Sequence, residues 1–136
     1  ISKVTQLATS NGYLYVLRGA VKTIDVFRLK DAKELHCKPD FSINADSLKK
    51  FGVNYFTPEQ LITDFSHPEV LFIKCRGSII ILDIDNKENI ILLDEIISVS
   101  TQNKFYRVAV NKERLVIVSD PDIIDLYTLE HIYIKN

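Results

Sequence analysis

Apolar and polar residues alternate along the chain in short stretches, each about the length of a β-strand. Three segments, 4–29, 61–84 and 106–129, repeat one order of stretches. In the first segment the order is an alternating stretch VTQLA, a break TSNG, an apolar stretch YLYVL, a break RGAVK and a final stretch TIDVFRL. The breaks contain Gly, Pro, Asn or Ser, which favour turns. Strands this short, with turns between them, predict an all-β fold built from repeated hairpins.

The final stretches share a tetrad that sets the spacing of the repeat. It reads VFRL at 26–29, ILDI at 81–84 and LYTL at 126–129. The tetrads lie about 55 and about 45 residues apart, near the ~40–45 residues of a propeller repeat. We therefore divide the chain into three blade-like units, at about 1–38, 60–97 and 104–136, and treat 39–59 as an insertion.

Each unit is expected to hold four antiparallel strands. A fourth apolar stretch follows each tetrad: ELHC at 34–37, NIILLDEI at 89–96 and HIYI at 131–134. A common offset of seven residues aligns the first two strands: Leu7 to Leu14, Asp64 to Leu71 and Val108 to Leu115. The predicted fold is all-β and propeller-like, with about three four-stranded antiparallel blades and a short helical insertion.

The insertion carries the signals of that helix. In NADSLKKFG, at 44–52, Asn44 or Asp46 can cap the amino end, and Gly52 can end the helix in a left-handed turn. The following TPEQ, at 57–60, also resembles a helix start. A helix there would compete with a strand at LITDF, 61–65, and we favour the strand, because the other two units have one in that place.

Composition narrows the class of protein. Hydrophobic residues make up 46% of the 136 residues and charged residues 26%, which fits one globular domain. The formal net charge of −1 is unlike that of a nucleic-acid binder, so we expect no nucleic-acid partner. Cys37 and Cys75 belong to no CxxC pair, and we expect reduced thiols in a cytoplasmic or nuclear protein. No secretory signal is visible. Because the chain begins with Ile, we expect a processed product or a piece of a longer polypeptide.

The second unit carries the closest resemblance to a known family. Its DFSHPEVLFIKCRGSIIILDI, at 64–84, resembles a divergent WD-repeat-type β-propeller, with Leu82 in the place of the family's Trp and Asp83 on its Asp. Phe27 and Tyr127 stand in the Trp position of the other units. Arg28 and Thr128 replace the Asp, and the family's Gly-His pair does not occur.

The resemblance implies a function as well as a fold. Propellers use roughly four to eight blades, so three units leave two blade faces open. Incomplete or split propellers occur in coat and pore scaffolds. We therefore expect a protein–protein interaction scaffold, a propeller segment in a subunit of a larger intracellular assembly. Other subunits, or the rest of the same polypeptide, are expected to complete the ring.

A membrane-associating propeller is the alternative. The stretch VAVNKERLVIV, at 108–118, is similar to the hairpin of phosphoinositide-binding propellers (PROPPINs). The family's Phe-Arg-Arg-Gly motif is absent, and only LRG at 17–19 and CRG at 75–77 occur. No lipid-contacting residue follows from this similarity, and outside this alternative any membrane role is expected to be indirect.

No residue pattern indicates catalysis, a cofactor or a metal, so we do not expect an enzyme. His36 and Cys37 are neighbours on a predicted strand and point to opposite faces, which does not suit one metal ion. His67 is expected to be a solvated loop residue, and His131 has no second ligand at metal spacing. The acidic stretches at 83–85 and 120–122 are interpreted as charged turns. Arg18 and Arg76 are expected to be exposed turn residues, with an anion contact as the functional alternative.

Overall fold

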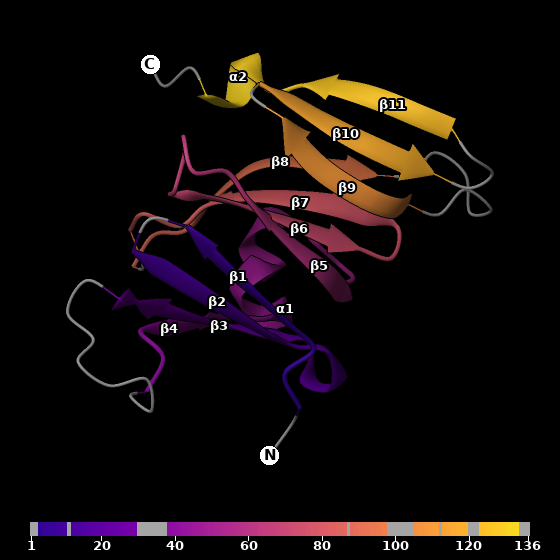
Figure 1. Cartoon of the computed structure of the whole chain (residues 1–136). Helices are drawn as coiled ribbons and strands as arrows, with labels where there is room; N and C mark the ends of the chain where they lie inside the picture. The colour runs from indigo at the N-terminus through magenta and orange to yellow at the C-terminus, as the bar shows by residue number, and fades with distance from the viewer. Residues whose placement is uncertain are drawn as a thin grey trace.

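The strands form three antiparallel sheets stacked one above the other (Figure 1). The computed structural model describes residues 3–10, 12–29, 38–86, 88–97, 105–111, 113–119 and 123–133. The first sheet has the order β1-β2-β3-β4, the second β5-β6-β7-β8, and the third β9-β10-β11. Their bounds are β1 Gln6–Ser10, β2 Tyr13–Arg18, β3 Thr23–Arg28, β4 Phe41–Ile43, β5 Pro58–Thr63, β6 Val70–Cys75, β7 Ser78–Asp83, β8 Ile91–Ile97, β9 Phe105–Asn111, β10 Arg114–Ser119 and β11 Ile123–Thr128. The predicted all-β fold of repeated hairpins is confirmed.

The three tetrads occupy one place in the three sheets. Tyr13 pairs with Arg28, Val70 with Asp83, and Arg114 with Thr128. The residue after each third strand closes the same backbone hydrogen bond: the amide N–H groups of Leu29, Ile84 and Leu129 donate to the carbonyls of Gly12, Glu69 and Glu113 at 2.8, 2.8 and 2.7 Å. This equivalence allows residues to be compared position by position between sheets.

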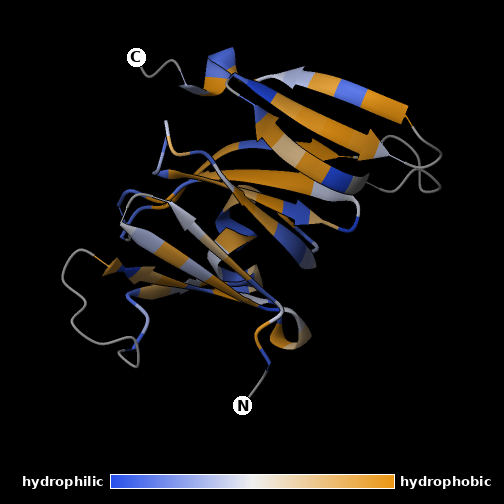
Figure 2. Ribbon diagram, in the orientation of Figure 1, coloured by the Kyte–Doolittle hydropathy of each residue, from blue (hydrophilic) through white to orange (hydrophobic). Residues whose placement is uncertain are grey.

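The middle sheet is covered on both faces. Every residue of β6 is buried, and so are the four central residues of β7. One core lies between the first and second sheets, around Tyr15, Ile73 and Leu82, and another between the second and third, around Phe72 and Ile117. Figure 2 shows the matching band of hydrophobic residues through the centre of the stack. Two-sided burial explains why β6 and β7 read as apolar runs and do not alternate.

The helical insertion is confirmed. Helix α1, Ala45–Leu48, is capped by Asn44, whose side chain accepts from the Ser47 N–H at 3.2 Å while the Ser47 hydroxyl accepts from the Asn44 N–H. The 3₁₀ turn η3, Lys49–Phe51, ends at Gly52 with φ of 79°. Leu48 is fully buried in the first core and holds the helix against the sheets.

Two fourth strands differ from the sequence prediction. In the first sheet the strand that pairs with β3 is β4, inside the segment 39–59 treated as an insertion, whereas 34–37 lies outside the described residues. In the third unit HIYI does not form a strand: helix α2, Glu130–Tyr133, begins two residues after β11. The buried side chain of Ile132, packed with Leu129 in the second core, favours this tight helical turn over an extended chain. The predicted strand at 89–96 is confirmed as β8.

The start of the second unit is also shifted. Thr63 pairs with Leu71, so the longer loop 64–69 separates the first two strands, and Asp64 lies beyond the strand. The place of Leu7 is therefore taken by Leu61, not by Asp64. The strand favoured at LITDF over a helix is confirmed for its first three residues, and β5 begins earlier than predicted, at Pro58.

Among the described residues, no helix is long and apolar enough to cross a membrane.

Candidate interaction surface

A glutamine clasp joins the first strands of neighbouring sheets. The Gln6 side chain in β1 accepts from the Leu61 N–H at 2.8 Å and donates to the Leu61 carbonyl at 3.4 Å. Gln60 occupies the place of Gln6 in the second sheet, and its amide donates to the Val108 carbonyl in β9 at 3.5 Å. Leu61 and Val108 are themselves equivalent residues. One contact is therefore repeated, always from one sheet to the next.

Hydroxyl groups support the first of these junctions. Thr63 donates to the Thr9 carbonyl at 2.8 Å, and Ser10 donates to the Asp64 carbonyl at 3.4 Å. These bonds hold β1 and β5 side by side, although, among the described strands, β5 forms a ladder only with β6. Backbone groups that no sheet ladder uses are satisfied in this way.

The outer face of the third sheet, which points away from the stack, is apolar and exposed. The face is formed by alternate residues of β9, β10 and β11 and contains Ala109, Val116, Val118, Ile124 and Leu126. Ile124 is 68% exposed and Leu126 60%. Their neighbours across the strand pair, Val118 and Val116, are half-buried. We refer to these five residues as the β11 face.

Residues at the same places in the other sheets are buried. Ile24 in the first sheet and Ile79 in the second correspond to Ile124, because each pairs with the residue at the same place in the second strand. Both are fully buried by the sheet that follows. Val26 and Ile81 correspond to Leu126 and are buried too. The third sheet thus keeps the apolar residues that the first two cover.

Arg107 lies on this face at the position that corresponds to Gln6 and Gln60, the two glutamines of the clasp. It pairs with Val118 in β9, as Gln60 pairs with Lys74 and Gln6 with Leu17. The side chain is exposed and borders the open hollow beside Gln60. A guanidinium group can donate to a carbonyl as the glutamine amides do.

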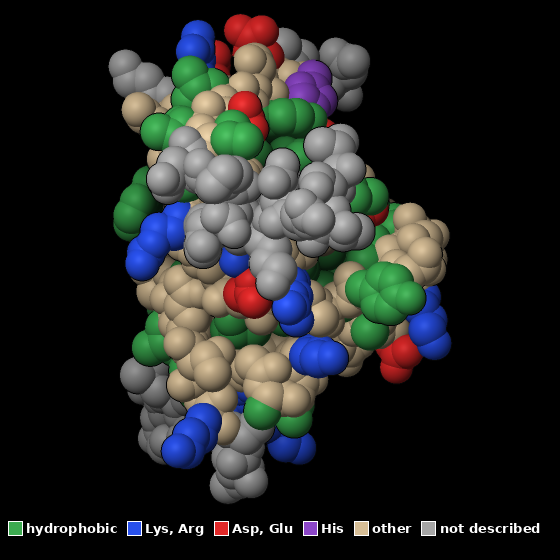
Figure 3. Space-filling view, turned by 90° about the vertical axis from the view of Figure 1, so that its right-hand side faces the viewer, with side chains coloured by type: hydrophobic (Ala, Val, Ile, Leu, Met, Phe, Trp, Pro, Cys, Tyr) green, Lys and Arg blue, Asp and Glu red, His purple; other side chains and the backbone are tan. Residues whose placement is uncertain are grey.

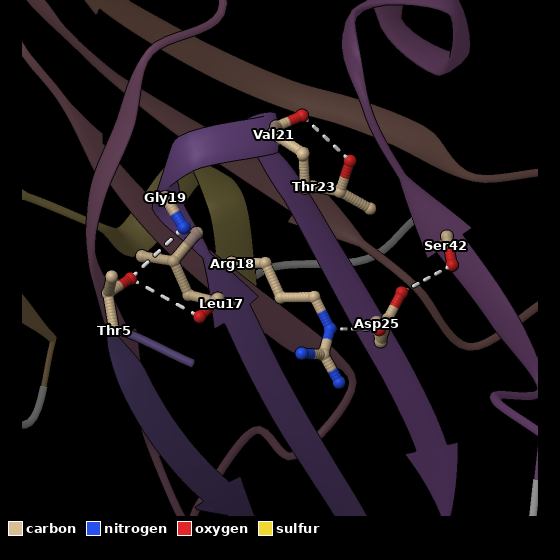
Figure 4. A network of polar contacts seen from close by, with 8 residues as sticks. All are labelled: Thr5, Leu17, Arg18, Gly19, Val21, Thr23, Asp25 and Ser42. Atoms are coloured by element: carbon tan, nitrogen blue, oxygen red, sulfur yellow. Dashed lines mark hydrogen bonds and ion pairs between the residues drawn. The ribbon is translucent and has the colours of Figure 1, made fainter. Parts of the chain in front are cut away.

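The outer face of the first sheet, at the opposite end of the stack, is more polar. Leu7 is 60% exposed, whereas its equivalents Leu61 and Val108 are buried by the preceding sheet. Beside it, Arg18 donates to Asp25 at 3.0 Å, and the Ser42 hydroxyl donates to the other Asp25 oxygen at 2.7 Å (Figure 4). We refer to this surface, with Leu7, Thr9, Leu14, Val16 and Phe27, as the β1 face. Leu7 and Thr9 are exposed in it, Leu14 and Phe27 are half-buried, and Val16 is only 6% exposed.

Side chains of β11 and helix α2 bind the third sheet to the second. The Tyr127 hydroxyl donates to the Asp94 carboxylate of β8, and His131 Nε2 lies 3.3 Å from the same oxygen. Burial raises the pKa of Tyr127 to about 12, with the Asp94 carboxylate adding to the shift. Burial alone raises the pKa of Asp94, but the hydrogen bonds from Tyr127, the Glu95 backbone and His131 outweigh it and lower the pKa.

A second tyrosine contact lies near the loop 64–69. Tyr133 of α2 donates to Asp64 at 3.0 Å, and its ring stacks on His67 with centroids 3.5 Å apart. Burial raises the pKa of Tyr133 well above its usual range, and Asp64 adds to the rise. His67 lies in this loop, as predicted, but the stacking leaves it half-buried and not solvated.

Arg18 and Arg76, both expected to be exposed turn residues, lie at different places in their sheets. Arg18 is the last residue of β2 and pairs with Asp25 on the β1 face, so its interpretation as an exposed turn residue is wrong. Arg76 is exposed in the turn after β6, where its N–H donates to Thr57 at 3.3 Å. By strand register, Cys75 is the residue that corresponds to Arg18.

The remaining candidate groups are structural or fall outside the described residues. Cys75 is a buried free thiol whose pKa burial raises to about 11, which makes it unreactive. Asp83 accepts from the Asp85 N–H at 3.0 Å, and this confirms a charged turn after β7. His36, Cys37 and the acidic stretch at 120–122 are outside the described residues. In the part of the chain that the structure describes, no three His, Cys, Asp or Glu side chains group to hold a metal.

An open cleft of about 720 Å³ lies at the turns that join the first two strands of the second and third sheets. Asp64, Ser66, His67, Asn111, Glu113 and Arg114 line it. Figure 3 shows the flank of the stack at the right of Figure 1, on the side away from this cleft, where acidic and basic side chains are both present. Charges of both signs line the cleft, so it selects no single ligand charge.

Comparison with known proteins gives no family: no family model matches the chain, and no curated protein matches it.

Sequence reasoning missed the clasp and the contrast between the sheet faces. Gln6, Gln60 and Arg107 are unremarkable when the chain is read alone. The signal is positional, since each residue precedes its unit's Leu7, Leu61 or Val108 by one. An alignment that equates Asp64 with Leu7 hides it, because the loop 64–69 lengthens the second unit.

Proposed function

We propose that the chain is a protein–protein interaction scaffold: a segment of a β-propeller, in a subunit of a larger intracellular assembly, whose outer sheet faces bind other protein. The observation that carries the proposal is the exposure of Ile124 and Leu126. Their equivalents in both other sheets are fully buried by the next sheet.

The energy involved favours a covered face. Burial of apolar surface contributes about 25 cal/mol per Å². Apolar side chains of a propeller-like repeat bury their faces only against neighbours. The β11 face gathers five apolar residues in one place, which is typical of surfaces that bind other proteins. A sheet face that stays exposed to solvent would carry polar residues at positions 124 and 126, as the solvent-facing sides of antiparallel sheets commonly do.

Site-specific photo-cross-linking tests the proposal. A photo-reactive phenylalanine analogue replaces Leu126 in the polypeptide as it is purified under native conditions. We expect cross-links to protein at this position. The matched control places the analogue at Tyr55, which is 84% exposed and lies in a loop. Equal and sparse cross-linking at both positions contradicts the proposal.

A further inference from the structure

We propose that the partner of the β11 face is the β1 face of a second copy of this chain, so that copies associate head to tail. The proposal rests on the proposed function and names its partner. It starts from what each end of the stack lacks. Among the strands that the structure describes, no sheet follows the β11 face and none precedes the β1 face.

The β1 face has the residues of a face that covers another sheet. The third sheet covers the second with Val108, Leu115, Ile117 and Tyr127. At the same places the β1 face carries Leu7, Leu14, Val16 and Phe27. Aliphatic residues thus match aliphatic residues, and an aromatic ring matches an aromatic ring.

The β1 face also matches the inner face of the third sheet at a polar position and at the end of the hairpin. Asp25 on the β1 face corresponds to Asp125 in β11, because Val16 and Ile117 are equivalent and pair with them. Leu29 corresponds to Leu129, as the shared hairpin-closing hydrogen bond shows. The β1 face therefore resembles a surface that this chain already packs onto a sheet.

The clasp specifies how the two copies meet. Gln6 reaches Leu61 and Gln60 reaches Val108, each in the next first strand. Continued by one step, Arg107 of one copy donates to the carbonyl of Leu7 in the other, because Leu7 is the residue equivalent to Leu61 and Val108. The strand β1 of the second copy then lies beside β9.

Such a contact joins two different surfaces, and head-to-tail contacts of this kind close into rings when the geometry permits. Two copies of three sheets each supply six, within the roughly four to eight of closed propellers. We therefore expect a dimer in which each copy uses both faces.

Complementation between two variants tests the head-to-tail arrangement. Ile124→Asp with Leu126→Asp blocks the β11 face, and Leu7→Asp with Thr9→Asp blocks the β1 face. All four positions are exposed, so the substitutions leave the cores intact, which circular dichroism verifies. Tyr55→Asp with Phe65→Asp, at exposed loop positions, is the matched control.

Light scattering after size-exclusion chromatography measures the molar mass of each variant of the 136-residue chain. We expect the wild type and the control to approach twice the 15.6 kDa of one chain as concentration rises. Each blocked variant alone stays monomeric, and an equimolar mixture of the two forms a one-to-one dimer through the remaining pair of intact faces. In the wild-type background, we expect Arg107→Ala to raise the dissociation constant of the dimer by about tenfold or more. Arg107→Gln places at this position the residue type found in the other two sheets, and we expect the dimer to keep its wild-type dissociation constant.

Two results overturn the proposal. A wild-type chain that stays monomeric at all concentrations excludes the second copy, and a mixture that fails to dimerise while the wild type does excludes the head-to-tail arrangement. Neither result contradicts the proposed function, because cross-links from position 126 to a different protein would still support an interaction scaffold. Absence of cross-links to any protein is the result that removes both.

Discussion

The Gln6 side chain binds both backbone polar groups of Leu61, accepting from its N–H at 2.8 Å and donating to its carbonyl at 3.4 Å. A side-chain amide thus substitutes for a neighbouring strand at the junction of two sheets. The same place is taken by Gln60 in the second sheet and by Arg107 in the third. The junction is therefore a property of the repeat and not of one sheet pair.

Removal of the first clasp destabilises the chain more than removal of the second. Gln6→Ala leaves the Leu61 N–H without its acceptor, and an unsatisfied buried group costs about 1–3 kcal/mol. Gln60→Ala removes a single long hydrogen bond, and we expect a loss of about 0.5–1.5 kcal/mol. Urea unfolding of the two variants gives both values. Equal losses would show that the N–H contact carries no special weight.

Truncation of the side chain at equivalent positions changes the unfolding free energy by very different amounts in adjacent sheets. Ile79→Ala opens a cavity beneath the third sheet, and we expect a loss of about 2–5 kcal/mol. Ile124→Ala removes an exposed side chain and changes the stability of the monomer by about 0.5 kcal/mol or less. Thermal or urea unfolding at low protein concentration measures the difference. A large loss at Ile124 in the monomer would mean that its face is already packed within one chain.

The helical insertion depends on its cap. Asn44→Ala removes the acceptor for the Ser47 N–H, and we expect a loss of about 1 kcal/mol of unfolding free energy. Asn44→Asp keeps an acceptor at the amino end of the helix and serves as the control. If both variants unfold at the wild-type urea concentration, the cap does not stabilise the fold.

High pH weakens the contact between Tyr127 in the third sheet and Asp94 in the second. The folded-state pKa of Tyr127 is raised from 10.0 to about 12, so its contribution to stability is fully present below pH 10 and is lost as the pH rises from 10 to about 12. Tyr127→Phe lacks this contribution and its pH dependence. The difference between the ultraviolet phenolate titrations of the wild type and Tyr127→Phe isolates this tyrosine from the others. A difference titration centred at pH 10 would show that Asp94 does not hold the hydroxyl.

Low pH acts on the same contact through its other partner. The pKa of Asp94 is lowered from 3.8, so its stabilising effect is present above about pH 3.8 and is lost as the pH falls through the folded-state value. We expect Asp94→Asn to reduce stability near neutral pH and to flatten the acid side of the stability curve. Stability measured by urea unfolding between pH 2 and pH 7 compares the two proteins. A parallel offset of the two curves would place the loss in packing and not in ionisation.

The repeated hairpins were predictable from the sequence because their signals are local. Alternating stretches, turn residues and the shared tetrads fix which residues form strands and which strand follows which. The cap at Asn44 and the end at Gly52 are local as well, and both are confirmed. The all-β class and the order of the first three strands in each sheet follow from such signals.

The elements that the sequence misplaced depend on distant contacts. HIYI has the composition of a strand, but Ile132 is drawn into the second core and Tyr133 reaches Asp64, 69 residues away. The two-sided burial of β6, the clasp and the exposure of Ile124 all depend on how sheets stack. No pattern within one strand records that relation.

The accessibility of position 124 in the natively purified polypeptide tests the central claim most directly. Ile124→Cys is labelled with a maleimide, and Tyr55→Cys is the exposed control; labelling of the unsubstituted polypeptide is subtracted as background. We predict that the thiol at position 124 is strongly protected while the one at position 55 reacts rapidly, and that mild denaturation removes the difference. Rapid and equal labelling at both positions under native conditions would show that the β11 face is open to solvent and would contradict the account.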